Sequence, residues 1–267
     1  MSAEYPMGKE FVKYKIENRI ATVIIDHPPV NALSDQVHFE IADVFDELRE
    51  KKDEIDVVII TGAGEKIFVA GADLHDWLKL NTIEGGRRRE QRNVTGFNKI
   101  RYFERPVIAA INGHALGGGI ELAMSCDLRI ASENARIGMV EVNVGIVPAG
   151  GGTQLLPRMI PLGIAKEWIF TGNQISVKEA ERWGLVNRVV PKGEALNEAL
   201  ELAKKLQTKS SKTLSLLKRA INEGLEMKLQ EGFALEGEMC GLAALSEDLH
   251  EGVKAFLEKR TPDFKGR

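Results

Sequence analysis

The sequence predicts a soluble α/β protein in which strands and helices alternate along the chain. Short runs rich in Val and Ile recur, and stretches with helical spacing of apolar residues lie between them. Some of these runs, such as VVII and VIAA, are apolar at every position. Strands of that kind are buried on both faces, which is typical of a sheet covered by helices on its two sides.

The individual elements follow from these patterns. Residues 34–50 form a helix, because their apolar side chains recur at i, i+4, i+7, i+8 and i+11 from Val37 onward. Each strand is a short run dominated by β-branched residues. The strands are predicted at 18–26, 55–62, 66–71, 106–113, 127–131 and 187–190.

The chain divides into two parts near residue 190. Strand patterns stop there and helical spacing takes over, as in Leu214, Leu217 and Ile221. We therefore expect a core domain over residues 1–190 and a helical region over residues 191–267. The later helices carry more apolar residues than one small domain covers, which predicts contacts between copies of the chain.

Composition narrows the function classes. The 267 residues carry 36 Lys and Arg against 39 Asp and Glu, so no net field attracts nucleic acid or an anionic membrane. Cys126 and Cys240 stand apart, which argues against a disulfide framework or a structural zinc site. The first residues lack an apolar export signal, and no run approaches the ~18 apolar residues of a membrane span. A cytoplasmic protein that acts on a small molecule is expected.

Nucleotide and triad motifs are incomplete. Neither GAGEK nor GGGTQL completes GxGxxG, and no GxxxxGK[ST] occurs. No GxSxG turn supports a triad of Ser or Cys126 with any of the five histidines, His27, His38, His75, His114 and His250. The basic stretch GGRRRE at residues 85–90 is interpreted as a solvated loop in preference to a phosphate site.

A glycine turn opens an apolar helix in GHALGGGIELAMSCD, residues 113–127, and places Glu121 within it. Gly118 and Glu121 are three residues apart, so on a helix they lie on one side. The free N–H of Gly118 and the carboxylate can then face one cavity, and a bare glycine lets a ligand oxygen approach the backbone. The alternative is a first-turn carboxylate that points to water and is favoured by the helix dipole.

A second glycine turn occurs in FVAGADLHDW, residues 68–77. Asp73 is suited to cap the following helix, and the N–H of Ala72 lies just before it. Two backbone donors from separate turns are what an oxyanion hole needs. An ordinary strand-to-helix turn is the alternative.

A second isolated glutamate, Glu141, stands in IGMVEVNVGIVPAGGGTQLLPR, residues 137–158. Glu121 and Glu141 both lie in apolar, glycine-rich surroundings, where loss of hydration raises the pKa of a carboxyl group. Two such groups beside one oxyanion site suit general acid/base catalysis.

Taken together, these stretches resemble the crotonase superfamily, and among its members the enoyl-CoA hydratases most. The resemblance runs from PPVNALS through VIITGAGEKIFVAGADL, RPVIAAINGHALGGGIELAMSCDLRIA and VGIVPAGGGTQLLPR to AFLEKRTPDFKG. It implies a spiral of ββα units with a C-terminal helical trimerisation region. One departure is Val140, because many family hydratases have proline before the second glutamate.

The resemblance assigns roles to individual residues. It places the oxyanion donors at the N–H groups of Ala72 and Gly118, makes Glu121 the base and makes Glu141 the proton donor. The segment from Leu74 to Phe103 is expected to shape the acyl pocket. Contacts to the CoA thioester are expected from Pro29, Val30, Ala32, Ala70, Gly71, Asp73, Leu74, Gly117, Phe256 and Lys259.

The activity that this resemblance implies is addition of water to a trans-2-enoyl-CoA. It implies no metal and no separate cofactor, because coenzyme A enters as part of the substrate, and it implies a homotrimer or homohexamer. Enoyl-CoA isomerisation, hydrolysis of a β-oxoacyl-CoA and acyl-CoA binding without catalysis remain the alternatives.

Overall fold

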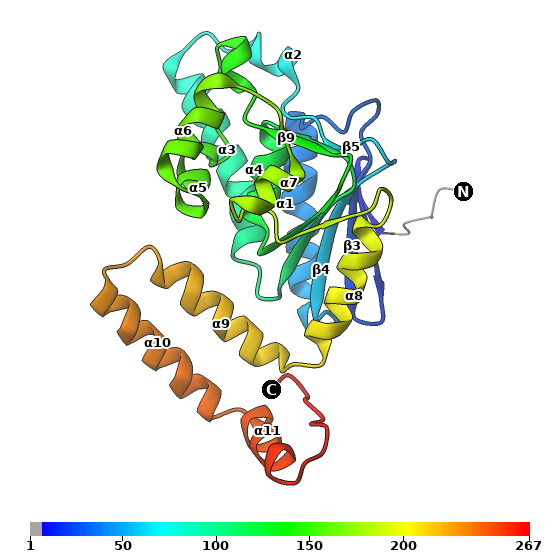
Figure 1. Cartoon of the computed structure of the whole chain (residues 1–267), viewed down its shortest axis with the longest axis vertical. Coiled ribbons are helices and arrows are strands. Elements are labelled where there is room, and N and C mark those ends of the chain that lie inside the picture. The colour runs from blue at the N-terminus through cyan, green and yellow to red at the C-terminus, as the bar shows by residue number, and fades with distance from the viewer. Residues whose placement is uncertain (1–6) are drawn as a thin grey trace.

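Two β-sheets and their connecting helices build the core of the computed structural model, which describes residues 7–267 (Figure 1). The prediction that the first residues lack an export signal falls partly on residues 1–6, which lie outside the described range. The large sheet has the order β1 (Met7–Gly8), β2 (Val12–Glu17), β3 (Ile20–Ile25), β4 (Val57–Gly62), β6 (Val107–Ile111), β8 (Leu128–Ser132) and β11 (Arg188–Val190). The small sheet has the order β10 (Ile175–Ser176), β9 (Arg136–Gly138), β7 (His114–Leu116) and β5 (Ile67–Val69).

The chain winds as a spiral that gives one strand to each sheet per turn. Strands β4, β6 and β8 are parallel neighbours in the large sheet, and the strand that follows each of them, β5, β7 or β9, takes the matching place in the small sheet. The predicted spiral of ββα units is confirmed. Its helical elements are α1 (Asp35–Glu50), η1 (Lys52–Glu54), α2 (Leu74–Trp77), α3 (Ile83–Arg101), α4 (Gly118–Ser125), η2 (Glu141–Val144), α5 (Gly152–Met159), α6 (Leu162–Thr171) and α7 (Val177–Arg182).

The large sheet is buried on both faces, as its apolar strands predict. Helices α1 and α3 lie over the face that carries the main core. On the other face α8 (Ala195–Gln207) packs through Ala199 and Ala203 against Ile59, Ile108 and Ile130. Small alanine side chains let this helix approach the sheet closely. Helix α8 therefore belongs to the packed core, although it lies in the expected helical region of residues 191–267.

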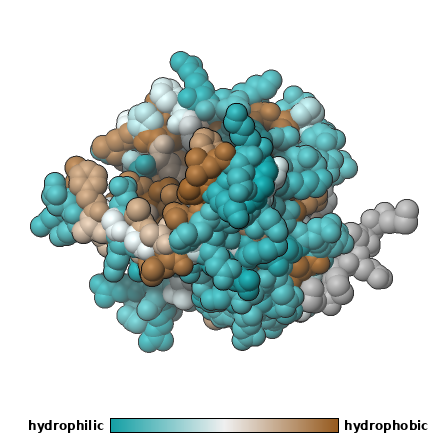
Figure 2. All heavy atoms as spheres, turned by 90° about the horizontal axis from the view of Figure 1, so that it is seen from below, coloured by the Kyte–Doolittle hydropathy of each residue, from teal (hydrophilic) through white to brown (hydrophobic). Residues whose placement is uncertain are grey.

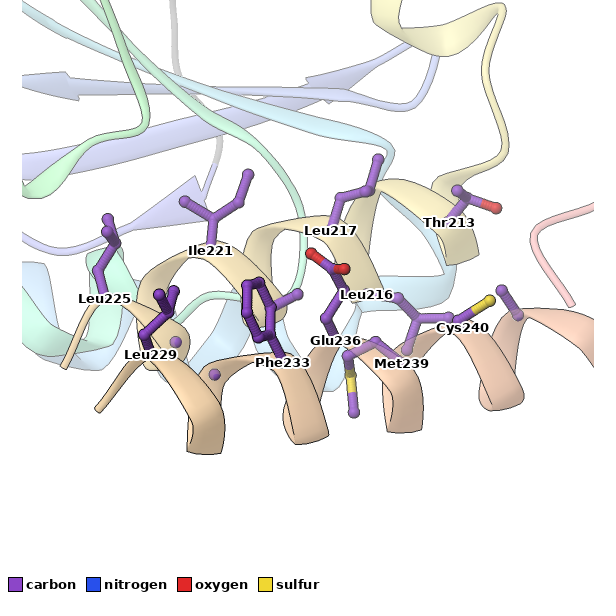
Figure 3. Close-up of a pocket in the computed structure, with 14 residues that line it drawn as sticks. Thr213, Leu216, Leu217, Ile221, Leu225, Leu229, Phe233, Glu236, Met239 and Cys240 are labelled. Carbon is purple, nitrogen blue, oxygen red and sulfur yellow. The ribbon is translucent and has the colours of Figure 1, made fainter. Parts of the chain in front are cut away.

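Three helices continue beyond the core as an arm: α9 (Ser211–Gly224), α10 (Leu229–Ala244) and α11 (Glu247–Leu257) (Figure 1). Helices α9 and α10 pack on each other, and a hollow of about 530 Å³ lies along them, as Figure 3 shows. Apolar side chains on this arm are exposed, including Leu225 at 80% and Leu229 at 70%. Figure 2 shows hydrophobic residues gathered around a hollow on the face seen from below.

The interpretation of GGRRRE as a solvated loop is wrong. These residues lie within α3, and Arg89 is only 3% exposed. Its guanidinium Nη1 donates to Asp35 Oδ1 at 3.1 Å. The prediction failed because the helical period places one of the three consecutive arginines on the buried face of α3.

None of the helices within residues 7–267 combines the length and the apolar character that crossing a bilayer requires.

Candidate active site

A cavity of about 280 Å³ lies where α2, α4 and η2 meet. It brings together residues that are far apart in the sequence, including both isolated glutamates and both glycine turns. Its lining comprises Leu33, His38, Ala70, Gly71, Ala72, Leu74, Trp77, Asn93, Leu116, Gly117, Gly118, Glu121, Val140, Glu141, Asn143, Val144, Ile146, Ala149 and Gln174.

Glu121 is buried in the wall of this cavity. It lies in the first turn of α4 and is 3% exposed, so the alternative of a solvent-facing carboxylate is wrong. Its Oε1 accepts hydrogen bonds from the amides of Gly150 and Gly152 at 2.8 and 2.7 Å. Burial raises the pKa of Glu121, and the two amides, which favour the ionised form, oppose that rise.

Glu141 is the first residue of η2 and lines the same cavity. Its Oε2 is buried and has no hydrogen-bond partner within the described chain. Burial, and then repulsion from Glu121, raise the pKa of Glu141 to about 7. Gly117, at φ +50°, leaves room for this carboxyl, because a Cβ there would lie 3.0 Å from Oε1 of Glu141.

The backbone amides of Ala72 and Gly118 lie at the cavity between the glutamates. Leu33 donates to the carbonyl of Gly71 at 2.8 Å, and Asp73 donates to the carbonyl of Leu33 at 3.2 Å. Since neighbouring residues of an extended segment point their amides to opposite sides, the N–H of Ala72 faces away from Leu33. The amides of Ala72 and Gly118 have no hydrogen-bond acceptor among residues 7–267.

These two amides also lie close to each other. A Cβ built on Gly118 would be 3.8 Å from the N of Ala72 and 3.9 Å from Oε2 of Glu121. The turn that carries Gly118 is fixed from behind, because the N–H of Gly117 donates to the carbonyl of Gly138 at 2.8 Å. Two free donors and a carboxylate therefore surround one point in the cavity.

Eight of the ten residues expected to contact the CoA thioester lie in or beside this cavity. The cavity lining includes Ala70, Gly71, Leu74 and Gly117. The turn that adjoins it contains Pro29, Val30 and Ala32, and is tied to the second glycine turn because the amide of Ala70 donates to the carbonyl of Val30 at 3.2 Å. Asp73 caps α2 by accepting from the amide of His75 at 2.9 Å.

Phe256 and Lys259 do not join this cavity within one chain. Phe256 is 82% exposed on α11, and Lys259 follows that helix. Figure 1 shows α11 at the opposite end of the molecule from α2.

Sequence reasoning missed five polar residues of the cavity wall: His38 on α1, Trp77 on α2, Asn93 on α3, Asn143 on η2 and Gln174. Trp77 and Asn93 fall in the segment expected to shape the acyl pocket. A signal for Asn93 was present, because it lies four residues from Phe97 on the buried face of a helix, where an apolar residue is usual.

The comparisons with known proteins identify the family of the chain. The family model for enoyl-CoA hydratase/isomerase matches residues 15–267. A short-chain-enoyl-CoA hydratase of Clostridium acetobutylicum is 45% identical over 253 residues, which cover 94% of this chain and 96% of the relative. A 2,3-dehydroadipyl-CoA hydratase of Escherichia coli is 38% identical, over 94% of this chain and 97% of its own.

A solved structure repeats the fold at full length. The enoyl-CoA hydratase from Bacillus anthracis matches with a TM-score of 0.91 at 38% identity, and the match covers 97% of this chain and 100% of that one. The sequence resemblance to the crotonase superfamily is thus confirmed, and the chain belongs to the enoyl-CoA hydratase/isomerase family.

Proposed function

We propose that this chain adds water across the C2–C3 double bond of a trans-2-enoyl-CoA to give a 3-hydroxyacyl-CoA. Curated relatives named as short-chain-enoyl-CoA and crotonyl-CoA hydratases, 45% and 40% identical, support this activity. The observation that carries the mechanism is the meeting of two carboxyl groups and two free amides in one cavity.

The amides of Ala72 and Gly118 would hold the thioester oxygen of the substrate. When water attacks C3, negative charge moves through the conjugated system to this oxygen. Donors that are already fixed by the backbone stabilise that charge without rearrangement, and the loss of one such donor costs ~2.7 to 4 kcal/mol.

The two glutamates would divide the proton transfers. Glu121, whose ionised form is favoured by two amides, takes a proton from the water that bonds to C3. Glu141, whose pKa of about 7 leaves it partly protonated near neutral pH, gives a proton to C2. The proton on Glu121 then returns to Glu141 or to solvent, and the pair is restored.

Coenzyme A enters as part of the substrate in this scheme, and the scheme uses neither a metal nor a redox cofactor. The turns at residues 28–33 and 70–74 border the cavity, so they are placed to contact the pantetheine and nucleotide parts of the thioester. We assign these contacts to Pro29, Val30, Ala32, Ala70, Gly71, Asp73 and Leu74.

The exposed arm would join copies of the chain into a homotrimer or homohexamer in the cytoplasm. On α9 and α10, Leu217, Ile221, Leu225, Leu229 and Phe233 line the hollow drawn in Figure 3. A neighbouring copy could bring Phe256 and Lys259 to a cavity that they do not reach in their own chain. Light scattering coupled to size exclusion tests this, since a monomer at micromolar concentration would contradict it.

Turnover of crotonyl-CoA tests the function. We expect a product heavier by one water and no free coenzyme A. Release of free CoA would point to hydrolysis instead. Recovery of 3-butenoyl-CoA of unchanged mass would point to isomerisation, and binding without turnover would point to a non-catalytic protein.

A further inference from the structure

Polar atoms without partners gather in the wall of the cavity beyond the glutamates. Trp77 Nε1, Asn93 Oδ1 and His38 Nδ1 are all buried and have no hydrogen-bond partner in the described chain. His38 and Asn93 are 3% and 5% exposed. Buried polar groups are normally hydrogen-bonded, because an unpaired buried donor or acceptor costs free energy. Three unpaired groups from separate helices around one cavity therefore indicate that a ligand binds there.

His38 lies one aromatic ring away from Glu121. The ring of Phe97 adjoins Glu121, since a Cβ on Gly150 would lie 2.7 Å from Phe97 Cε2 and 2.5 Å from Glu121 Oε2. The centroid of the Phe97 ring also lies 5.3 Å from that of the His38 ring. An acyl tail that starts beside Glu121 lies in the cavity that Trp77 and Asn93 also line.

The groups in contact with this part of the cavity are uncharged. Burial, together with Arg89 and Arg92, lowers the pKa of His38 to about 3, so its imidazole is neutral. A neutral imidazole offers one donor and one acceptor, a carboxamide offers both, and an indole offers one donor. Within the described residues, Glu121 and Glu141 are the sole ionisable carboxyl groups of the lining.

Two arginines lie behind this wall and outside the lining. The guanidinium of Arg89 stacks over the ring of Trp77 at 4.9 Å, and Arg89 and Arg92 share the carboxylate of Asp35. Nε and Nη2 of Arg89 and Nε of Arg92 are also buried without a hydrogen-bond partner in the described chain, and their charge would favour an anionic tail. Neither side chain lines the cavity, however, so a carboxylate there would have no cation in contact with it. Neutral donors and acceptors match a neutral group better.

Resting on the proposed hydratase function, we infer that this cavity selects short enoyl-CoA thioesters whose acyl tail ends in an uncharged hydrogen-bonding group such as a hydroxyl. Such a group accepts from Trp77 Nε1 and donates to Asn93 Oδ1. A plain alkyl tail leaves both unpaired, and enzymes reject substrates that do so.

Three thioesters of equal length test the inference: trans-2-hexenoyl-CoA, its 6-hydroxy derivative and trans-2-hexenedioyl-CoA. We expect kcat/KM for the hydroxyl substrate to exceed that for the alkyl one by about tenfold or more. An equal or higher value for the alkyl substrate overturns the inference, and so does a preference for the dicarboxylic thioester. Crotonyl-CoA carries no acyl carbon beyond C4 and no terminal polar group, so its hydration reports on the proposed function separately.

Substitutions test whether Trp77 and Asn93 cause the preference for the hydroxyl substrate. Trp77→Phe keeps the ring and its stacking but removes the N–H, and should reduce the hydroxyl-to-alkyl ratio of kcat/KM by about tenfold. Asn93→Leu should favour the alkyl substrate. Trp183→Phe, outside the cavity, is the matched control and should leave the ratio unchanged. Ratios unaffected by both Trp77→Phe and Asn93→Leu would contradict the assignment.

Discussion

Glu121 and Glu141 border one cavity but are held differently: two backbone amides donate to Oε1 of Glu121, whereas Oε2 of Glu141 is buried without a donor. Amide donors stabilise an ionised carboxylate, and burial without donors favours the protonated form. These surroundings support the proposed roles of Glu121 as base and Glu141 as acid, although burial raises the pKa of both groups and their titrations are coupled.

The first prediction concerns pH. Because Glu141 must be protonated to give a proton to C2, kcat should fall as pH rises through about 7, where its pKa lies. Rates measured with crotonyl-CoA between about pH 5.5 and 9 test this. Removing the charge in Glu121→Gln should move the titration of Glu141 to lower pH, which carbon NMR of the labelled carboxyl group can follow. A rate that rises across this range would contradict the assignment of Glu141 as the acid.

The second prediction concerns the proposed oxyanion donor at Gly118. This residue is the first of α4, where proline is tolerated because its missing N–H has no partner within the helix. Gly118→Pro should therefore keep the fold and reduce kcat by about 10²- to 10³-fold, as for loss of one oxyanion-hole donor.

The control for that variant is Gly118→Ala. It keeps the N–H, and its Cβ would meet the flexible end of Leu33 at 3.0 Å. It should retain far more activity than the proline variant at a similar melting temperature. Equal losses in the two variants would show that space at this position matters and the N–H does not.

The third prediction concerns the turn behind Glu121. A Cβ on Gly152 would lie 2.1 Å from Met139 Cε and 2.9 Å from Glu121 Oε1, so Gly152→Ala must displace the carboxylate or its surroundings. We expect a lower kcat and a loss of stability of about 1 to 3 kcal/mol, as for other overpacked sites.

Gly163→Ala serves as its matched control. Gly163 lies in α6, and a Cβ there would meet nothing within 4 Å. This change should leave activity unchanged and stabilise the helix by several tenths of a kcal/mol, on the order of the difference between glycine and alanine in a helix. Thermal unfolding of both variants measures the contrast, and equal behaviour would refute it.

Much of the fold could be predicted because most of its longer strands are runs of β-branched and apolar residues. All six runs predicted as strands correspond to strands of the structure, from β3 to β11. The strands that were not predicted are β1, β2, β7, β9 and β10, of which four have only two or three residues. Pieces of that length carry no periodicity, and pairing with a neighbouring strand defines them.

The candidate site was predictable where backbone turns make it. Gly117, Gly118 and Ala72 stand in glycine motifs whose chemistry is visible in the sequence. His38 and Asn93 were not, because each is a single polar residue on the buried face of its helix, and only the packing of α1 on α3 brings them together. Residues so far apart in the sequence show no pattern that would predict their proximity.

Hydration of crotonyl-CoA by Glu121→Gln, Glu141→Gln and the double variant tests the central claim most directly. Glutamine keeps the shape and an oxygen to accept from Gly150 and Gly152, so each protein should fold. Each single change should lower kcat by about 10²- to 10⁴-fold, and the double change should cost much less than the product of the two. Wild-type kcat in either single variant would contradict the claim that both carboxyl groups carry the reaction.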